Sequence, residues 1–146
     1  LLGKSMEFMA TLPGFTPPEF FPPIFKPGFE IEIPLKSFMG LEVKGNPMVI
    51  VFWLIWVIIN IGTEEFLWRG YALPRMEIYF GKWAWLINGI LWNIVIHFFF
   101  RWSYIGLIPI SLLLPYICQK TKSLWPGVII HGIGNLLLLV ILIPSM

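Results

Sequence analysis

The sequence of 146 residues has no aspartate, one cysteine and two histidines. A lone Cys118 excludes an intrachain disulfide and a cysteine zinc cluster. We expect it to be a small buried hydrophobic side chain, not a nucleophile. Charged residues make up only 12% of the chain, against about 25% in soluble domains. The net charge of +2 is too small to indicate nucleic-acid binding, so no nucleic-acid partner is expected.

Apolar residues are more abundant than in a typical soluble protein. Hydrophobic residues make up 58% of the chain and aromatic residues 17%, and the mean hydropathy is +0.81. Soluble domains contain roughly 45–50% apolar residues. The composition therefore predicts an integral membrane protein that contacts the lipid bilayer of a cell membrane.

Residues 1–47 differ from the rest because they contain eight of the thirteen prolines. Prolines at this density exclude a regular helix. Phenylalanines are interleaved with these prolines, whereas disordered linkers are poor in aromatic residues. We expect a Pro-rich arm that lies on the membrane surface or packs over the domain, or the end of a longer upstream region.

Residues 48–146 predict an all-α, polytopic transmembrane bundle of about four core helices. The sequence places Pro74 where it would kink or end the first helix. Ser123 is a possible N-cap of the last helix. The expected ranges are Met48 to about Tyr79, Trp83 to Phe100, Tyr104 to Ile117, and Ser123 to about Ile143.

Basic residues in the loops suggest an orientation. Arg75 and Lys82 lie between the first two helices, and Lys120 and Lys122 lie between the last two. By the positive-inside rule these two loops face the cytoplasm, and Arg101 faces the other side. We therefore expect the active site to open toward the cytoplasmic side.

Two adjacent carboxylates and an arginine follow the first apolar run. Each charge in such a segment costs at least ~2.5–3.5 kcal/mol, so functional roles are the first hypothesis. Glu65 and Arg69 are four residues apart and share a helix face, so they are expected to pair. Glu64 points roughly 100° away and is the candidate base that activates water. A purely structural ion pair is the alternative.

The two histidines lie in later apolar segments. At ~1.5 Å per residue, Glu64 and His97 lie about 24 and 21 Å above a turn near residues 80–81, which places them level. His131 and Asn135 are one helical turn apart, and such a pair can donate hydrogen bonds to an oxyanion. Gly132 and Gly134 are expected to permit either a close helix approach or access for a substrate backbone. Taken alone, the His131–Asn135 pair is equally compatible with a polar contact between helices, and His97 favours a structural role over a catalytic one. The catalytic hypothesis depends on the combination of the three segments.

Three segments together resemble the motifs of the CAAX prenyl endopeptidase and bacteriocin-processing (CPBP) intramembrane proteases. The resemblance spans about Asn60 to Leu138 and departs once, since Asn93 stands where the family has phenylalanine. That phenylalanine is a packing position in the family. The matching segments are Glu64-Glu65-x-x-x-Arg69-Gly70, His97 at the end of an apolar helix, and Ser123-Leu124-Trp125-Pro126-Gly127 followed by His131-x-x-x-Asn135.

The resemblance implies a peptidase that hydrolyses a peptide bond within the membrane. In this reading Glu64 and His97 activate a water molecule, while His131 and Asn135 stabilise the oxyanion. Glu65 and Arg69 support them. The implied substrate is a peptide or protein, prenylated or otherwise membrane-anchored.

The resemblance leaves the role of metal open, because the family has been described both with a metalloprotease mechanism and with a metal-free glutamate mechanism. Glutamate and histidine are zinc ligands, but the chain has no His-Glu-x-x-His motif. We expect that no cofactor is required, with a divalent metal such as zinc as the alternative.

Two non-enzymatic hypotheses compete with the protease. One is a membrane scaffold or bacteriocin self-immunity protein that keeps the same fold. The other is a proton or ion carrier, which would need a continuous polar path to both sides of the membrane. Apart from Asn60, the first half of the first helix offers no such path.

Overall fold

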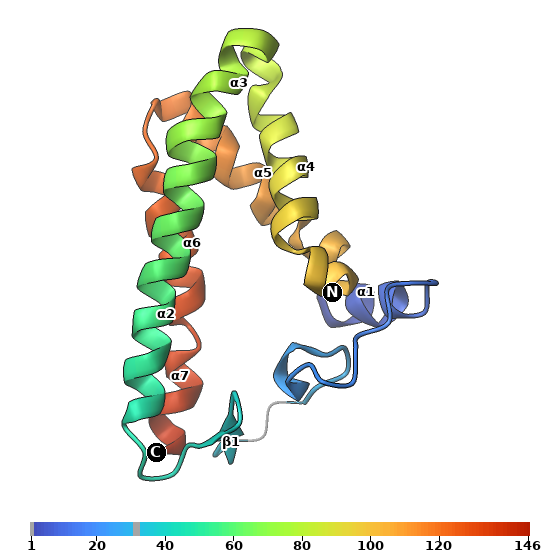
Figure 1. Ribbon diagram of the computed structural model, residues 1–146, viewed down its shortest axis with the longest axis vertical. Coiled ribbons are helices and arrows are strands. Elements are labelled where there is room, and N and C mark those ends of the chain that lie inside the picture. Colours follow the sequence, from blue (N-terminus) through green and yellow to red (C-terminus); the bar gives the residue numbers. More distant parts are fainter. Residues whose placement is uncertain (1, 31–32) are drawn as a thin grey trace.

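The computed structural model describes residues 2–30 and 33–146, and the predicted all-α helical bundle is confirmed (Figure 1). The strands found in this described part are β1 (Ser37–Phe38) and β2 (Leu41–Glu42), which form one short antiparallel hairpin. Three helical stretches are long and apolar enough to cross a membrane. They cover Met48–Ile96, which includes a hairpin turn, then Phe98–Thr121 and Trp125–Ser145.

The first rod of the bundle has three parts. It comprises α2 (Met48–Glu65), a π-helical segment (Phe66–Ala72) and α3 (Leu73–Phe80). Pro74 lies in the first turn of α3, where a missing N–H is tolerated. The rod is about 50 Å long, so it exceeds the ~30 Å hydrocarbon core of a bilayer. The sequence predicted its continuity but not the π-helical segment.

The chain then reverses at Gly81, whose φ of +52° suits a glycine. After the 3₁₀ turn Gly81–Trp83, α4 runs from Ala84 to Ile96, five residues shorter than predicted. His97 ends α4 with φ −94° and ψ 21°, and the chain continues as the 3₁₀ segment Phe98–Ser103.

The last two predicted helices also differ at their ends. α5 (Tyr104–Thr121) extends one turn beyond the predicted end and contains Pro109 and Pro115. The final helix is divided into α6 (Trp125–Leu136) and α7 (Leu139–Leu142), followed by the 3₁₀ turn Ile143–Ser145. Ser123 Oγ accepts a 3.3 Å hydrogen bond from the Trp125 N–H.

The helices form two packed pairs that diverge from a common end (Figure 1). One pair is α2 with α6, and the other is α4 with α5, which also contacts α6. Gly89 permits the close approach of α4 to α5, because a Cβ there would overlap the backbone oxygen of Ser111. This packing places residues of α2, α4 and α6 within reach of one another.

The N-terminal arm contains a helix, which corrects the expectation that prolines exclude one. α1 spans Leu2–Ala10. It forms because Pro13 is the first proline, so the preceding residues keep their backbone N–H donors.

The proline-rich part of the arm packs beneath α4 and α5. Trp102 Nε1 donates a 2.8 Å hydrogen bond to the Phe25 carbonyl. The Phe21 ring makes edge-to-face contacts with Phe100 and Trp102, at centroid distances of 5.1 and 5.3 Å. These contacts join the arm to the 3₁₀ segment that follows α4.

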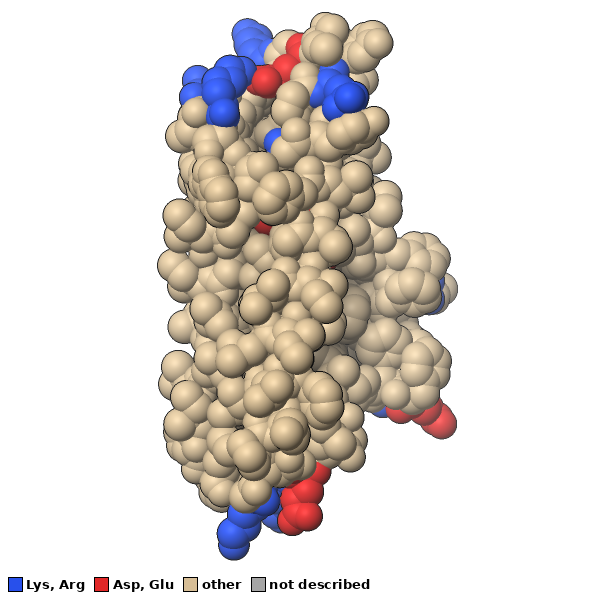
Figure 2. All heavy atoms as spheres, turned by 60° about the vertical axis from the view of Figure 1, so that its left-hand side comes forward, with Lys and Arg blue, Asp and Glu red and all other residues tan. Residues whose placement is uncertain are grey.

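The outer surface is apolar over most of its length, as a lipid-facing surface should be. Ile58 of α2 is 72% exposed and Val140 of α7 is 68% exposed. Figure 2 shows charged side chains gathered toward the two ends of the molecule, with an apolar belt between them. This distribution fits a membrane-spanning protein.

Candidate active site

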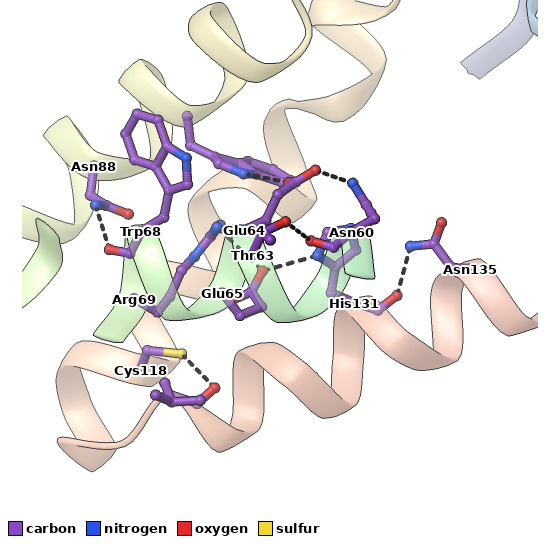
Figure 3. A network of polar contacts seen from close by, with 12 residues as sticks. Asn60, Thr63, Glu64, Glu65, Trp68, Arg69, Asn88, Cys118, His131 and Asn135 are labelled. Atoms are coloured by element: carbon purple, nitrogen blue, oxygen red, sulfur yellow. Dashed lines mark hydrogen bonds and ion pairs between the residues drawn. The ribbon is translucent and has the colours of Figure 1, made fainter. Parts of the chain in front are cut away.

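Glu64 accepts hydrogen bonds on both carboxylate oxygens (Figure 3). Asn60, one turn earlier on α2, donates to Oε1 at 2.5 Å. Trp92 of α4 donates its indole Nε1–H to Oε2 at 2.9 Å. Among the described residues no cation pairs with Glu64, but the carboxylate is held by two donors that the sequence analysis did not assign.

Glu65 contacts both a guanidinium and an imidazole. Its Oε1 lies 3.3 Å from a terminal nitrogen of Arg69 and 3.0 Å from Nδ1 of His131. The Glu65 and Arg69 side chains are fully buried. The predicted four-residue pairing therefore joins the end of α2 to the π-helical segment. The Glu65 carboxylate also contacts a histidine of α6, which spacing along one helix does not predict.

Trp92 lies at the centre of this group of side chains. The Arg69 guanidinium carbon lies over the indole, 4.3 Å from the ring centroid. The rings of His97 and His131 meet it edge to face, at centroid distances of 4.9 and 5.8 Å. Glu64, His97 and His131 thus converge on one indole, and the sequence analysis missed this residue.

Asn135 lies one helical turn after His131 on α6. Its Nδ2 donates a 3.0 Å hydrogen bond to the backbone oxygen of His131 (Figure 3). The described contacts do not join the Asn135 side chain to Glu64 or His97. It lies on the same face of α6 as His131, as the spacing indicates, but is turned toward its own helix.

Asn93, which departs from the family pattern, has a structural role. It is only 6% exposed, and its Nδ2 donates a 3.1 Å hydrogen bond to the Tyr104 carbonyl at the start of α5. Its backbone oxygen accepts the N–H of His97. A polar link between α4 and α5 thus occupies the position at which the family packs a phenyl ring.

The π-helical segment is anchored by a residue from α4. Its Trp68 carbonyl accepts the N–H of Leu73, five residues later, and also Nδ2 of Asn88 at 3.1 Å. π-Helical turns are rare and often lie at functional sites. Here the segment contains Arg69, so the extra residue in the turn sets where the guanidinium points. Asn88 is fully buried and is, with Asn93, one of two buried amide side chains on α4.

Gly127 permits α6 to approach the buried carboxylate. A Cβ at this position would overlap Oε2 of Glu65 and lie 3.1 Å from the Cys118 sulfur. At Gly132 the nearest atom would be an ordinary 3.7 Å away, and at Gly134 nothing lies within 4 Å. The close helix approach is therefore found at Gly127, one to two turns before Gly132 and Gly134, and the space beside these two glycines leaves the alternative of substrate access as a prediction.

The arrangement of carboxylates and imidazoles bears on whether the site could hold a metal ion. Zinc sites use three or four protein ligands within bonding distance. In the described residues, no group of three or more His, Cys, Asp or Glu side chains is placed to hold a metal ion. Several buried polar atoms of the cluster have no hydrogen-bond partner among the described residues, although one terminal nitrogen of Arg69 is ion-paired with Glu65. They are Glu65 Oε2, the three guanidinium nitrogens of Arg69 and His97 Nδ1.

Comparison with known proteins identifies the family. The model of the family described as type II CAAX prenyl endopeptidase Rce1-like matches residues 46–137, which is more than half of the chain. No curated protein and no solved structure matches the chain. The matched region runs from the residue before Pro47 to the residue after α6 and includes every predicted site residue. The resemblance seen in the motifs is thus confirmed, and the chain belongs to the Rce1-like type II CAAX prenyl endopeptidases, a family of membrane-embedded peptidases.

Proposed function

We propose that this chain hydrolyses a peptide bond within the membrane, using Glu64 and His97 to activate a water molecule. The observation that carries the proposal is the convergence on Trp92. This one indole donates a hydrogen bond to Glu64 and contacts the rings of His97 and His131. Carboxylate and imidazole side chains gathered in an apolar bundle are the groups that general acid–base hydrolysis requires.

In the proposed reaction Glu64 accepts a proton from water as the hydroxide oxygen attacks the substrate carbonyl carbon. The C–N bond then breaks, and the proton passes from Glu64 to the leaving amine, which gives a carboxylic acid and an amine. His97 orients the water through Nδ1, a buried ring nitrogen that has no partner in the structure. Both carboxylate oxygens of Glu64 are already held by donors, so the base is oriented before substrate arrives.

The groups proposed to stabilise the oxyanion come from α6. The Glu65 carboxylate lies at Nδ1 of His131 and sets the orientation of the ring, so the imidazolium form can donate Nε2–H to the oxyanion. Asn135 uses one N–H on the His131 carbonyl, and its second N–H is the other donor. Arg69 supports both roles because it pairs with Glu65 and covers Trp92.

The proposed substrate is a membrane-anchored peptide, and the family name indicates a prenylated C-terminus. The route is metal-free in our proposal, because the donor set offers no three-ligand site among the described residues. The side from which substrate enters is proposed to be cytoplasmic, from the basic loops at the α3–α4 end.

A cleavage assay in defined bilayers tests this proposal. Wild type, Glu64→Ala and His97→Ala are compared on prenylated and unprenylated peptides, each with and without a chelator. Loss of cleavage in both variants, with no effect of the chelator on wild type, is the expected result. Glu42→Gln, an exposed carboxylate on β2, is the matched control and should cleave normally. Full cleavage by Glu64→Ala would overturn the proposal, and inhibition by chelator would overturn its metal-free form.

A further inference from the structure

A second site lies outside the catalytic cluster, at the end of the bundle where α3 turns into α4. A cavity of about 620 Å³ opens there between this turn and the end of α5. Three lysines and three aromatic rings line it. They are Lys82, Lys120 and Lys122, with Trp83, Trp85 and Tyr116.

Gln119 lines this cavity and joins its two sides by hydrogen bonds. Gln119 Oε1 accepts a 2.8 Å hydrogen bond from the Trp85 backbone N–H, and its Nε2 donates a 2.9 Å bond to the Gly81 carbonyl. Trp85 and Tyr116 meet edge to face at 5.3 Å and form a wall. These contacts join the α3–α4 turn to α5, so the shape of the cavity does not depend on exposed side chains alone.

Two of the lysines have no acidic partner in the described part of the chain. The ammonium groups of Lys82 and Lys120 lie over the rings of Trp83 and Tyr116, at 5.6 and 5.8 Å. The third, Lys122, is paired at 2.5 Å with Glu77, the one carboxylate that lines the cavity. After this pairing the cavity carries two uncompensated positive charges.

The cavity lies at the basic end of the molecule, where membrane lipid headgroups are expected. Figure 2 shows lysine and arginine side chains gathered at this end, beyond the apolar belt. Tryptophan and tyrosine favour the headgroup level of a membrane, and basic pockets between transmembrane helices bind anionic headgroups. We propose that this cavity binds the phosphodiester headgroup of an anionic membrane lipid, with Lys82 and Lys120 as the charged contacts and the aromatic rings against the glycerol and upper acyl region.

The proposal is tested by lipid binding, separately from cleavage. Full-length protein in nanodiscs is titrated with phosphatidylglycerol in a phosphatidylcholine background, and bound lipid is counted by native mass spectrometry. Each lysine near a membrane surface contributes about 1 kcal/mol to the binding of anionic lipid. We therefore expect Lys82→Gln/Lys120→Gln to bind phosphatidylglycerol roughly tenfold or more weakly than wild type does. Lys82→Arg/Lys120→Arg should restore binding, and raised salt should weaken it in wild type.

The matched control removes two lysines from the opposite end. Lys36 and Lys44 are exposed and flank the β1–β2 hairpin, so Lys36→Gln/Lys44→Gln changes net charge equally. Normal binding by this control supports a site, whereas equal losses in both double variants would show a general charge effect and overturn the proposal. A further arm offers inorganic phosphate in lipid-free detergent micelles. Saturable binding there with the same lysine dependence would identify free phosphate as the ligand and overturn the lipid assignment.

Discussion

The indole N–H of Trp92 on α4 donates a 2.9 Å hydrogen bond to Oε2 of Glu64 on α2. This bond joins the two helical pairs at the depth of the buried charges, and it orients the carboxylate that we propose as the base. Hydrogen bonds to charged groups contribute about 1.5–3 kcal/mol. The position of Glu64 therefore depends on a residue of another helix.

Trp92→Phe keeps an aromatic ring under Arg69 but removes the indole N–H. We expect a fall in kcat of about 10- to 100-fold, because Glu64 loses its orientation, with a decrease in thermal stability of only a few degrees. Rates of peptide cleavage and thermal unfolding of the same samples measure both effects. A variant that keeps the wild-type rate would show that this bond does not position the base.

Removing one partner of the buried Glu65–Arg69 pair should destabilise the fold. Arg69→Met leaves a buried carboxylate without its cation, and breaking such a pair costs about 3–5 kcal/mol. The double variant Glu65→Gln/Arg69→Met should be more stable than Arg69→Met alone, because no uncompensated charge remains. Thermal unfolding in detergent compares the three proteins. Equal melting temperatures for wild type and Arg69→Met would contradict the burial seen here.

Gly127→Ala should destabilise the site through a steric clash. The added methyl group overlaps Oε2 of Glu65, and overpacking costs typically about 1–3 kcal/mol. Gly134→Ala is the matched control on the same helix, since nothing lies within 4 Å of the added group. Unfolding temperatures and cleavage rates should fall for the first variant and stay near wild type for the second. The reverse order would refute the packing of α6 against Glu65.

Asn135→Ala should separate catalysis from stability. The Asn135 amide bonds only to the backbone of its own helix among the described contacts, so the melting temperature should change little. If the amide donates to the oxyanion, kcat should fall about 10²–10³-fold while KM stays similar. An unchanged kcat would remove Asn135 from the proposed oxyanion site.

The sequence predicted those features that depend on spacing along one helix. The pairing of Glu65 with Arg69 follows from the four-residue repeat, and the long apolar runs define the bundle. The central place of Trp92 could not be predicted, because it is one of eight tryptophans and its direction depends on how α4 is rotated against α2. The π-helical segment was missed for a similar reason, since a side chain from α4, Asn88, supports the Trp68 carbonyl.

The contact between Glu65 and His131 also lay beyond sequence reasoning. It requires α6 to lie against α2, which depends on Gly127 more than on Gly132 and Gly134. The two adjacent glutamates therefore have distinct surroundings: Glu64 is held by neutral donors, and Glu65 is held between a guanidinium and an imidazole.

The central claim is that Glu64, and not Glu65, takes the proton from water. The most direct measurement is the single-turnover cleavage rate of a membrane-anchored peptide by Glu64→Gln and Glu65→Gln in the same bilayer, with peptide binding measured in parallel. We predict that Glu64→Gln binds the peptide normally and cleaves it at least about 10³-fold more slowly than wild type, a loss within the range for general-base and orientation effects. Glu65→Gln should retain measurable cleavage. Wild-type cleavage by Glu64→Gln together with none by a folded Glu65→Gln would contradict the account.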